Sequence, residues 1–264
     1  GVSVLGYEEV YLTMAEFMGY EKKLNAKLVP YNDKIASFRS VKEEYELERM
    51  RKAQDITDKA FAEVLSRIEV GMTEKQLCAE LIYCLLKNGA DGLAFDPIVV
   101  SGPNTSLPHG VPGDRKIQEG DFITMDFGAL YAGYCADMTR TVAVGYVTDE
   151  MEKVYKIVLQ AQLAGLAASK AGVPGKEIDG AARKVIEEAG YGPYFGHGYG
   201  HSLGLEIHES PSPSPSNEKG MPAGSVASAE PGIYLPGQFG VRIEETCIFR
   251  EDGIEILTQS PKEL

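Results

Sequence analysis

The sequence predicts an α+β fold built from two similar halves, each with amphipathic helices followed by antiparallel strands. Two observations predict this fold. The order of helix-like and strand-like segments occurs twice along the chain, and glycines and apolar residues recur at a constant separation in the two copies. Separately, all four histidines lie in two short stretches that also hold clustered carboxylates and glycines, which marks a candidate site. Helices and strands that come in separate runs are typical of α+β proteins.

The segment at the N-terminal end, residues 1–37, differs from the rest. Its short elements are expected, in order, at strand Val2–Gly6, strand Val10–Leu12, helix Ala15–Leu24 and strand Lys27–Val29. A segment this short buries too little apolar surface to be stable alone. We interpret it as the remnant of a truncated N-terminal domain, followed by the main domain over residues 38–264. An arm packed on the main domain is the alternative.

The first half begins with two helices. An amphipathic pattern predicts a long helix over residues 41–68. Thr73 and Gln76 form a capping box that opens a second helix, which ends at Gly89. Residues 93–145 then alternate apolar and polar positions between glycine turns, which indicates strands.

The second half repeats this order. Helices are expected over residues 149–171 and 176–189, with strands and loops over residues 194–250. Within the last range, serine and proline alternate over residues 210–216. A flexible linker is one interpretation of that alternation. Its position between His208 and Glu230 favours an active-site loop, and proline would stiffen that loop.

The two halves also match at their carboxylates. Asp126 and Glu230 occupy equivalent glycine-flanked positions, and Asp137 and Glu244 precede equivalent threonine-containing strands. Chance similarity of amphipathic helices explains the matching helices but not the matching carboxylates. We therefore infer an internal duplication with pseudo-two-fold symmetry, and a site between the halves.

Composition limits the classes of function. The chain has 264 residues, 44% hydrophobic residues and a formal net charge of −13, which disfavours nucleic acid or an anionic membrane as partner. No apolar run approaches the ~20 residues of a membrane span. No secretion signal opens the chain, and its four cysteines form no CxxC pair. We expect a cytoplasmic protein.

The clustered residues predict a metal centre. Imidazole and carboxylate are typical ligands of divalent transition metals. Two divalent cations would balance the charge of four carboxylates, and His201 adds an imidazole. The four carboxylates are Asp126, Asp137, Glu230 and Glu244. Such a centre would activate a water molecule as nucleophile.

Five motifs together resemble one known family. They are Pro108-His109, Asp126-Phe127-Gly128, Asp137 to Thr141, Glu230-Pro231-Gly232 and Arg242-Ile243-Glu244, and they accompany a signature from His197 to Glu209. In this order they resemble the proline-peptidase branch of the pita-bread metallopeptidases, which includes prolidase and Xaa-Pro aminopeptidase. Methionine aminopeptidase and creatinase are relatives. The resemblance implies the pita-bread fold over about residues 38–255.

The resemblance also implies roles for individual residues. The metal ligands would be Asp126, Asp137, His201, Glu230 and Glu244. The catalytic residues would be His109, His208 and Glu230, with Glu230 as proton shuttle. The substrate-binding residues would be His197, Tyr199 and Arg242. The cofactor would be two divalent ions, Mn²⁺ or Co²⁺, with Zn²⁺ and Fe²⁺ as alternatives. The full-length protein would be a homodimer.

The implied activity is hydrolysis of the Xaa-Pro bond at the N-terminus of dipeptides or short peptides. One alternative is methionine aminopeptidase, whose first histidine motif usually has cysteine where Pro108 precedes His109. A second alternative is an inert pita-bread module that binds proteins, although such modules lose metal ligands and this chain keeps all five. Creatinase-type chemistry runs without metal, so the intact ligand set disfavours it.

Overall fold

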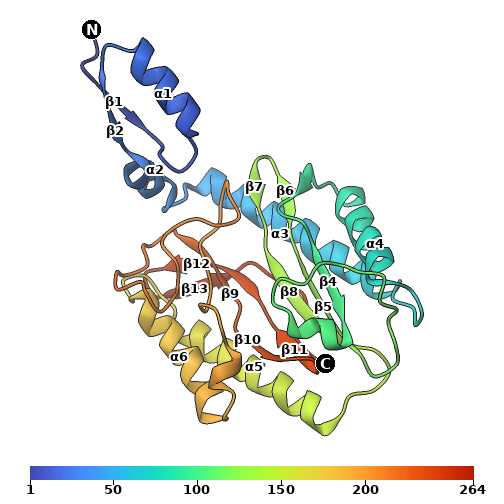
Figure 1. The fold of residues 1–264 in the computed structure, drawn as a ribbon. Helices are drawn as coiled ribbons and strands as arrows, with labels where there is room; N and C mark the ends of the chain where they lie inside the picture. The colour runs from blue at the N-terminus through green and yellow to red at the C-terminus, as the bar shows by residue number, and fades with distance from the viewer.

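The computed structural model describes residues 1–264. The first elements form a small unit at the edge of the molecule (Figure 1). They are β1 (Val4–Tyr7), α1 (Met14–Lys23), β2 (Lys27–Pro30) and α2 (Asn32–Arg39). The two strands pair in parallel. The strand expected at Val10–Leu12 is wrong: the amides of Tyr11 and Leu12 donate to the Glu8 carbonyl and form a turn instead.

The first half of the main body contains the two expected helices and six strands. In chain order the elements are α3 (Glu44–Leu65), α4 (Glu74–Lys87), β3 (Gly92–Leu93), β4 (Ile98–Ser101), β5 (Phe122–Phe127), β6 (Ala129–Tyr131), β7 (Tyr134–Cys135) and β8 (Met138–Ala143). Strands β4, β5 and β8 form one antiparallel sheet, and β3, β6 and β7 form another. The capping box at Thr73 is present, and it opens α4 as expected.

The second half contains two helices and five strands. They are α5 (Asp149–Ala168), α6 (Gly175–Glu188), β9 (Val226–Ala229), β10 (Gly232–Leu235), β11 (Phe239–Arg242), β12 (Glu245–Arg250) and β13 (Gly253–Ile256). Helices α4 and α6 both have 14 residues, as a duplication requires. Figure 1 shows α3 and α4 on one side of the strands and α5 and α6 on the other. This is the expected pita-bread arrangement.

Each half has its own hydrophobic core. A cluster of 15 buried residues joins α3 and α4 to the first half's strands, and a cluster of 22 joins α5 and α6 to the second half's strands. Amphipathic helices bury their apolar faces against the sheet, which stabilises both layers. None of the helices combines the length and apolarity that a membrane crossing requires.

The two halves meet where β8 lies against the segment from β11 to β12. The Glu244 amide donates to the Thr139 carbonyl at 3.1 Å, and the Thr246 hydroxyl donates to the Asp137 carbonyl at 2.8 Å. The buried Arg140 side chain donates to the Glu244 carbonyl from across this junction. These bonds place the segment before β8 beside the segment before β12, and so bring Asp137 next to Glu244.

Candidate active site

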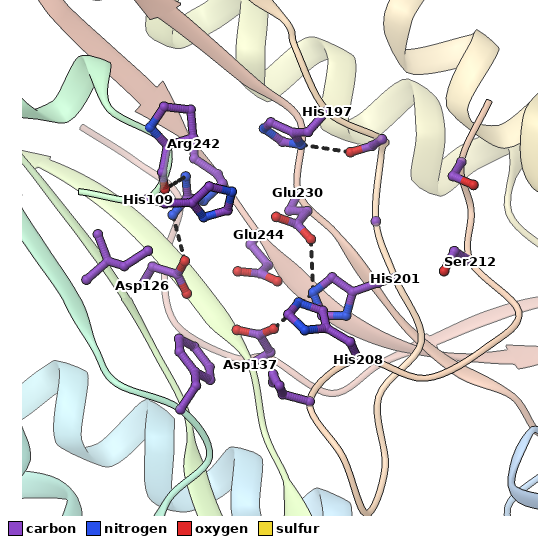
Figure 2. A pocket seen from close by; sticks show the side chains of 17 residues that line it. His109, Asp126, Asp137, His197, His201, His208, Ser212, Glu230, Arg242 and Glu244 are labelled. Atoms are coloured by element: carbon purple, nitrogen blue, oxygen red, sulfur yellow. Dashed lines mark hydrogen bonds and ion pairs between the residues drawn. The ribbon is translucent and has the colours of Figure 1, made fainter. Parts of the chain in front are cut away.

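A cavity of about 380 Å³ lies between the two halves. Side chains from both halves line it, and Figure 2 shows the carboxylates and imidazoles pointing toward its centre. All five residues expected as metal ligands lie in its wall, together with all four histidines and Arg242. The structure therefore brings together residues that lie far apart in the sequence.

Strand geometry directs the carboxylates into this cavity. Along β5, Met125 and Phe127 are fully buried in the core, so the alternation of side chains turns Asp126 to the opposite face. Gly128 follows, and a Cβ there would lie 1.7 Å from the Ala136 carbonyl oxygen. Only glycine permits this close approach, which keeps the Asp137 segment beside β5.

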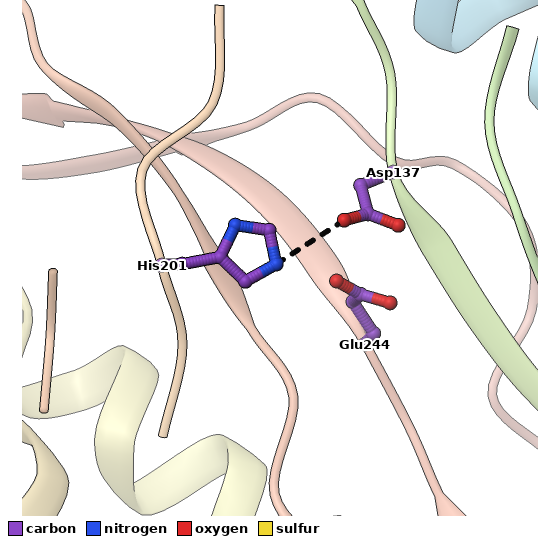
Figure 3. A group of neighbouring side chains, drawn as sticks. All are labelled: Asp137, His201 and Glu244. Atoms are coloured by element: carbon purple, nitrogen blue, oxygen red, sulfur yellow. Dashed lines mark ion pairs between the residues drawn. The ribbon is translucent and has the colours of Figure 1, made fainter. Parts of the chain in front are cut away.

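Three side chains form the centre of the cluster (Figure 3). Ligand atoms of Asp137, His201 and Glu244 lie within 4.8 Å of one another. The His201 Nε2 atom is 3.4 Å from Asp137 Oδ2 and 3.2 Å from Glu230 Oε1. Asp126 lies in the same wall, where Arg242 Nη2 donates to its Oδ2 at 2.6 Å.

Unpartnered oxygens indicate that this cluster suits a cation. Asp137 Oδ1 and Glu244 Oε1 are buried and have no hydrogen-bond partner, whereas Glu244 Oε2 accepts from the Thr139 hydroxyl at 2.6 Å. Buried polar atoms in native proteins nearly always have partners. A divalent metal ion would be a positively charged partner for both oxygens. Carboxylate with imidazole is a common donor set for such metals.

The pKa shifts follow from the same crowding. Burial, with repulsion from neighbouring carboxylates, raises the pKa of Asp137 and of Glu244 well above the usual range. Burial also raises the pKa of Asp126, although the charge of Arg242 opposes the shift. Burial alone would lower the pKa of His201, but its hydrogen bond to Glu230 raises that pKa to about 9.

Glu230 shows the complementary shift. Burial would raise its pKa, but the hydrogen bond with His201 and the charge of that ring lower it to about 2. Ser228 also donates to Glu230 Oε1, at 2.9 Å. Without metal, a proton on His201 thus supplies positive charge between Glu230 and Asp137, where a cation would otherwise do so.

Comparison with known proteins agrees with this geometry. The profile of metallopeptidase family M24 matches residues 48–251. This chain belongs to metallopeptidase family M24. It is 42% identical over 265 residues to an uncharacterised peptidase of Bacillus subtilis (strain 168), covering 100% of this chain and 75% of the relative. The chain is therefore a metallopeptidase, a hydrolase of peptide bonds.

Two further relatives have more specific names. The chain is 40% identical to a protein named Xaa-Pro dipeptidase from Pyrococcus furiosus, over 98% of this chain and 78% of that one. The crystal structure of an X-Pro aminopeptidase from Thermotoga maritima MSB8 matches with a TM-score of 0.97 and 44% identity, over 99% of this chain and 74% of that one. The expected pita-bread fold is confirmed.

The other histidines of this metallopeptidase surround the cluster. The His208 ring lies 4.4 Å from the His201 ring, centroid to centroid, and remains exposed to the cavity. His109 is exposed in the facing wall (Figure 2). His197 is fixed more firmly, because Nε2 is 2.8 Å from the Tyr234 hydroxyl and Nδ1 is 2.9 Å from the Gly198 carbonyl oxygen.

Tyr199 does not lie where a substrate-binding residue should. Its side chain is 1% exposed and is absent from the cavity wall, and its hydroxyl donates to the Gln162 carbonyl at 2.8 Å. A Cβ at Gly165 would lie 2.2 Å from the tyrosine ring, so glycine in α5 makes room for it. Tyr199 therefore anchors its loop to the core, and the expectation of substrate contact is corrected.

The structure shows how further residues support the site. The Tyr234 hydroxyl accepts a bond from Arg242 Nη1 at 2.9 Å and contacts His197. The Thr139 hydroxyl donates to Glu244 and accepts from Arg242 Nε at 3.0 Å. Ser212, Ser214 and the apolar Phe95 line the cavity. In the sequence, the Ser-Pro alternation marks the two serines and the Asp137 to Thr141 motif contains Thr139, whereas an apolar wall residue such as Phe95 has no pattern of its own.

Proposed function

We propose that this metallopeptidase hydrolyses the bond between an N-terminal residue and proline, with two divalent cations held by the five expected ligands. The convergence of four carboxylates and His201, with two buried carboxylate oxygens unpartnered, carries the dinuclear part of the proposal. The Xaa-Pro and X-Pro names of the similar proteins support the substrate. The Xaa-Pro bond is a tertiary amide of restricted geometry, which justifies a dedicated enzyme.

The ligands divide naturally between two cations. Asp126 with Asp137 would hold one ion, His201 with Glu230 the other, and Asp137 and Glu244 would bridge them. When bound, the cations lower the pKa of a water molecule toward neutrality and polarise the substrate carbonyl. The oxygen-rich ligand set suits Mn²⁺ or Co²⁺, and Zn²⁺ or Fe²⁺ can also bind to it.

The chain's own residues then move protons and orient the substrate. Glu230 accepts a proton from the attacking water and returns it to the proline nitrogen as the amide bond breaks. His208 donates a hydrogen bond to the oxygen on which negative charge develops, and His109 contacts the substrate from the facing wall. Arg242 opposes the rise that burial causes in the pKa of Asp126, and its planar fork orients that carboxylate.

Peptide hydrolysis with added Mn²⁺ tests this function. The protein should cleave Ala-Pro-Ala and leave Ala-Ala-Ala largely intact. His201→Ala should lower kcat/KM on the order of 10³-fold, because a metal ligand is lost, and elemental analysis should show less bound metal. Lys184→Ala, an exposed change on α6, is the control and should leave both properties unchanged. Full activity in His201→Ala would refute the assignment.

A further experiment separates the alternative enzyme. Methionine aminopeptidase should release methionine from Met-Ala-Ser and ignore Ala-Pro-Ala. Preferential cleavage of Met-Ala-Ser would therefore contradict the proline specificity while leaving the metallopeptidase assignment in place. Absence of Mn²⁺ and Co²⁺ binding would instead favour an inert binding module.

A further inference from the structure

One histidine of the cavity wall depends on its backbone for its position. The ring of His109 is exposed and makes no hydrogen bond within the protein. The residue that follows it is packed tightly, since a Cβ at Gly110 would lie 2.8 Å from Val100 Cγ1. Whatever holds residues 101–113, the His109 loop, therefore fixes the place of this imidazole in the cavity wall (Figure 2).

A buried carboxylate outside the cavity holds both ends of the His109 loop. Glu74 is the first residue of α4, and it is fully buried. Its Oε1 atom accepts hydrogen bonds from the Ser101 amide at 2.7 Å, from the Ser101 hydroxyl at 2.9 Å and from Asn104 Nδ2 at 3.0 Å. Its Oε2 atom accepts from the Gly113 amide at 2.9 Å. One side chain thus joins the segments before and after His109.

The carboxylate and the loop stabilise each other. A carboxylate has about four acceptor sites, and every side-chain hydrogen bond of Glu74 goes to the His109 loop. Strand β4 is an edge strand, so the Ser101 amide at its end takes Glu74 as its partner in place of a further strand. Burial of a carboxylate is costly unless donors surround it. Hydrogen bonds to a charged acceptor are also stronger than neutral ones, which makes this a firm anchor.

The other side of the His109 loop is attached to the second half. The Thr105 hydroxyl accepts from the Gly240 amide of β11 at 2.8 Å. The Pro108 carbonyl accepts from Arg242 Nη1 at 3.2 Å. The loop therefore spans the distance between α4 and β11, and Glu74 is its anchor on the α4 side. Loss of that anchor would let the loop tilt about its contacts with the second half.

We propose that Glu74 is a positioning residue that acts on the reaction through His109. This inference rests on the proposed function, in which His109 contacts the substrate. A displacement of about 1 Å at the active site can lower a rate by about 100-fold. Because the contacts with β11 and Arg242 would remain, the displacement should be smaller. We expect loss of the Glu74 anchor to lower kcat/KM by about tenfold.

Hydrogen exchange in Glu74→Gln tests the anchor without reference to activity. The substitution keeps the size of the side chain but replaces one acceptor oxygen by a donor, so at least one end of the loop loses its partner. Amide exchange over residues 101–113 should accelerate by about tenfold, with no change in α5. Glu80→Gln is the matched control, because it makes the same change on α4 at a side chain that is 42% exposed. It should leave exchange in the loop unchanged.

A double-mutant cycle with His109→Ala separates positioning from a general loss of structure. On the Mn²⁺-loaded protein with Ala-Pro-Ala as substrate, Glu74→Gln should lower kcat/KM by about tenfold. In the His109→Ala background the same change should lower it by less than about twofold. Bound metal should be equal in all four proteins. Asn104→Ala removes one of the four bonds and should cost about threefold, again only when His109 is present.

Each outcome decides one part of the inference. Unchanged exchange over residues 101–113 in Glu74→Gln overturns the anchor. An equal loss of kcat/KM with and without His109 overturns positioning through that residue. If Glu74→Gln does not fold, Asn104→Ala decides both points by the same measurements. No hydrolysis by the unaltered protein overturns the proposed function and the catalytic part of the inference, whereas the exchange result still decides the anchor.

Discussion

The replacement of Asp137 by asparagine should stabilise the metal-free protein and at the same time destroy metal binding. Asp137 is 3% exposed, and its Oδ1 has no partner. Burial and the charge of Glu244 raise its pKa well above 3.8. An acid whose pKa is raised by folding costs stability; the cost is full above the raised pKa, shrinks as pH falls through the range between the two pKa values, and is absent below the usual pKa. At pH 7 without metal, Asp137 therefore opposes folding.

The magnitude follows from the burial of this group. Asparagine removes the uncompensated buried charge of Asp137, which is worth about 2 kcal/mol, and a protein of this length gains about 2 °C in Tm per kcal/mol. Asp137→Asn should thus raise Tm by about 4 °C in EDTA. In the unaltered protein, a metal at 100 times its Kd contributes about 2.7 kcal/mol, or about 5 °C. The variant should lose this gain.

Thermal unfolding in EDTA and in excess Mn²⁺ measures both effects. Asp121→Asn is the matched control, because Asp121 is also buried but accepts two bonds from Arg115, at 2.6 and 2.9 Å. That variant should lower Tm and keep the gain from Mn²⁺. The reasoning fails if Asp137→Asn is no more stable than the unaltered protein in EDTA, or if Mn²⁺ stabilises both equally.

Two further predictions concern residues outside the metal cluster. Tyr199→Phe should lower the free energy of unfolding by about 1.5 kcal/mol, because the hydrogen bond from the Tyr199 hydroxyl to the Gln162 carbonyl is lost. Denaturant unfolding measures this change. A raised KM with unchanged stability would instead indicate that Tyr199 contacts the substrate. The hydrogen bonds from Arg51 and Arg250 lower the pKa of Glu255 to about 2, so its contribution to stability is present above pH 4.5 and is lost as pH falls toward 2. Glu255→Gln should therefore cost about 0.5 kcal/mol at pH 7, a value suited to a partly exposed pair, and nothing near pH 2; an equal cost at both pH values contradicts the ion-pair explanation.

The fold was largely predictable because its signals are local or periodic. The apolar spacing of α4 and α6, and the capping box at Thr73, depend on residues within one helix. The strand misplaced at Val10–Leu12 shows the limit of such patterns, since three apolar residues in a row fit a turn equally well when nearby carbonyls accept their amides.

The sequence by itself determined the types of residue in the site and their pairing between two halves. Residue type and spacing are properties of the chain, so the sequence alone was enough to name the five expected ligands and Arg242. Tertiary structure alone decided that Arg242 pairs with Asp126 and that Tyr199 faces the core. These facts depend on which groups meet in three dimensions, and partners that are 37 residues apart, as Tyr199 and Gln162 are, or 116 apart, as Asp126 and Arg242 are, leave no local pattern.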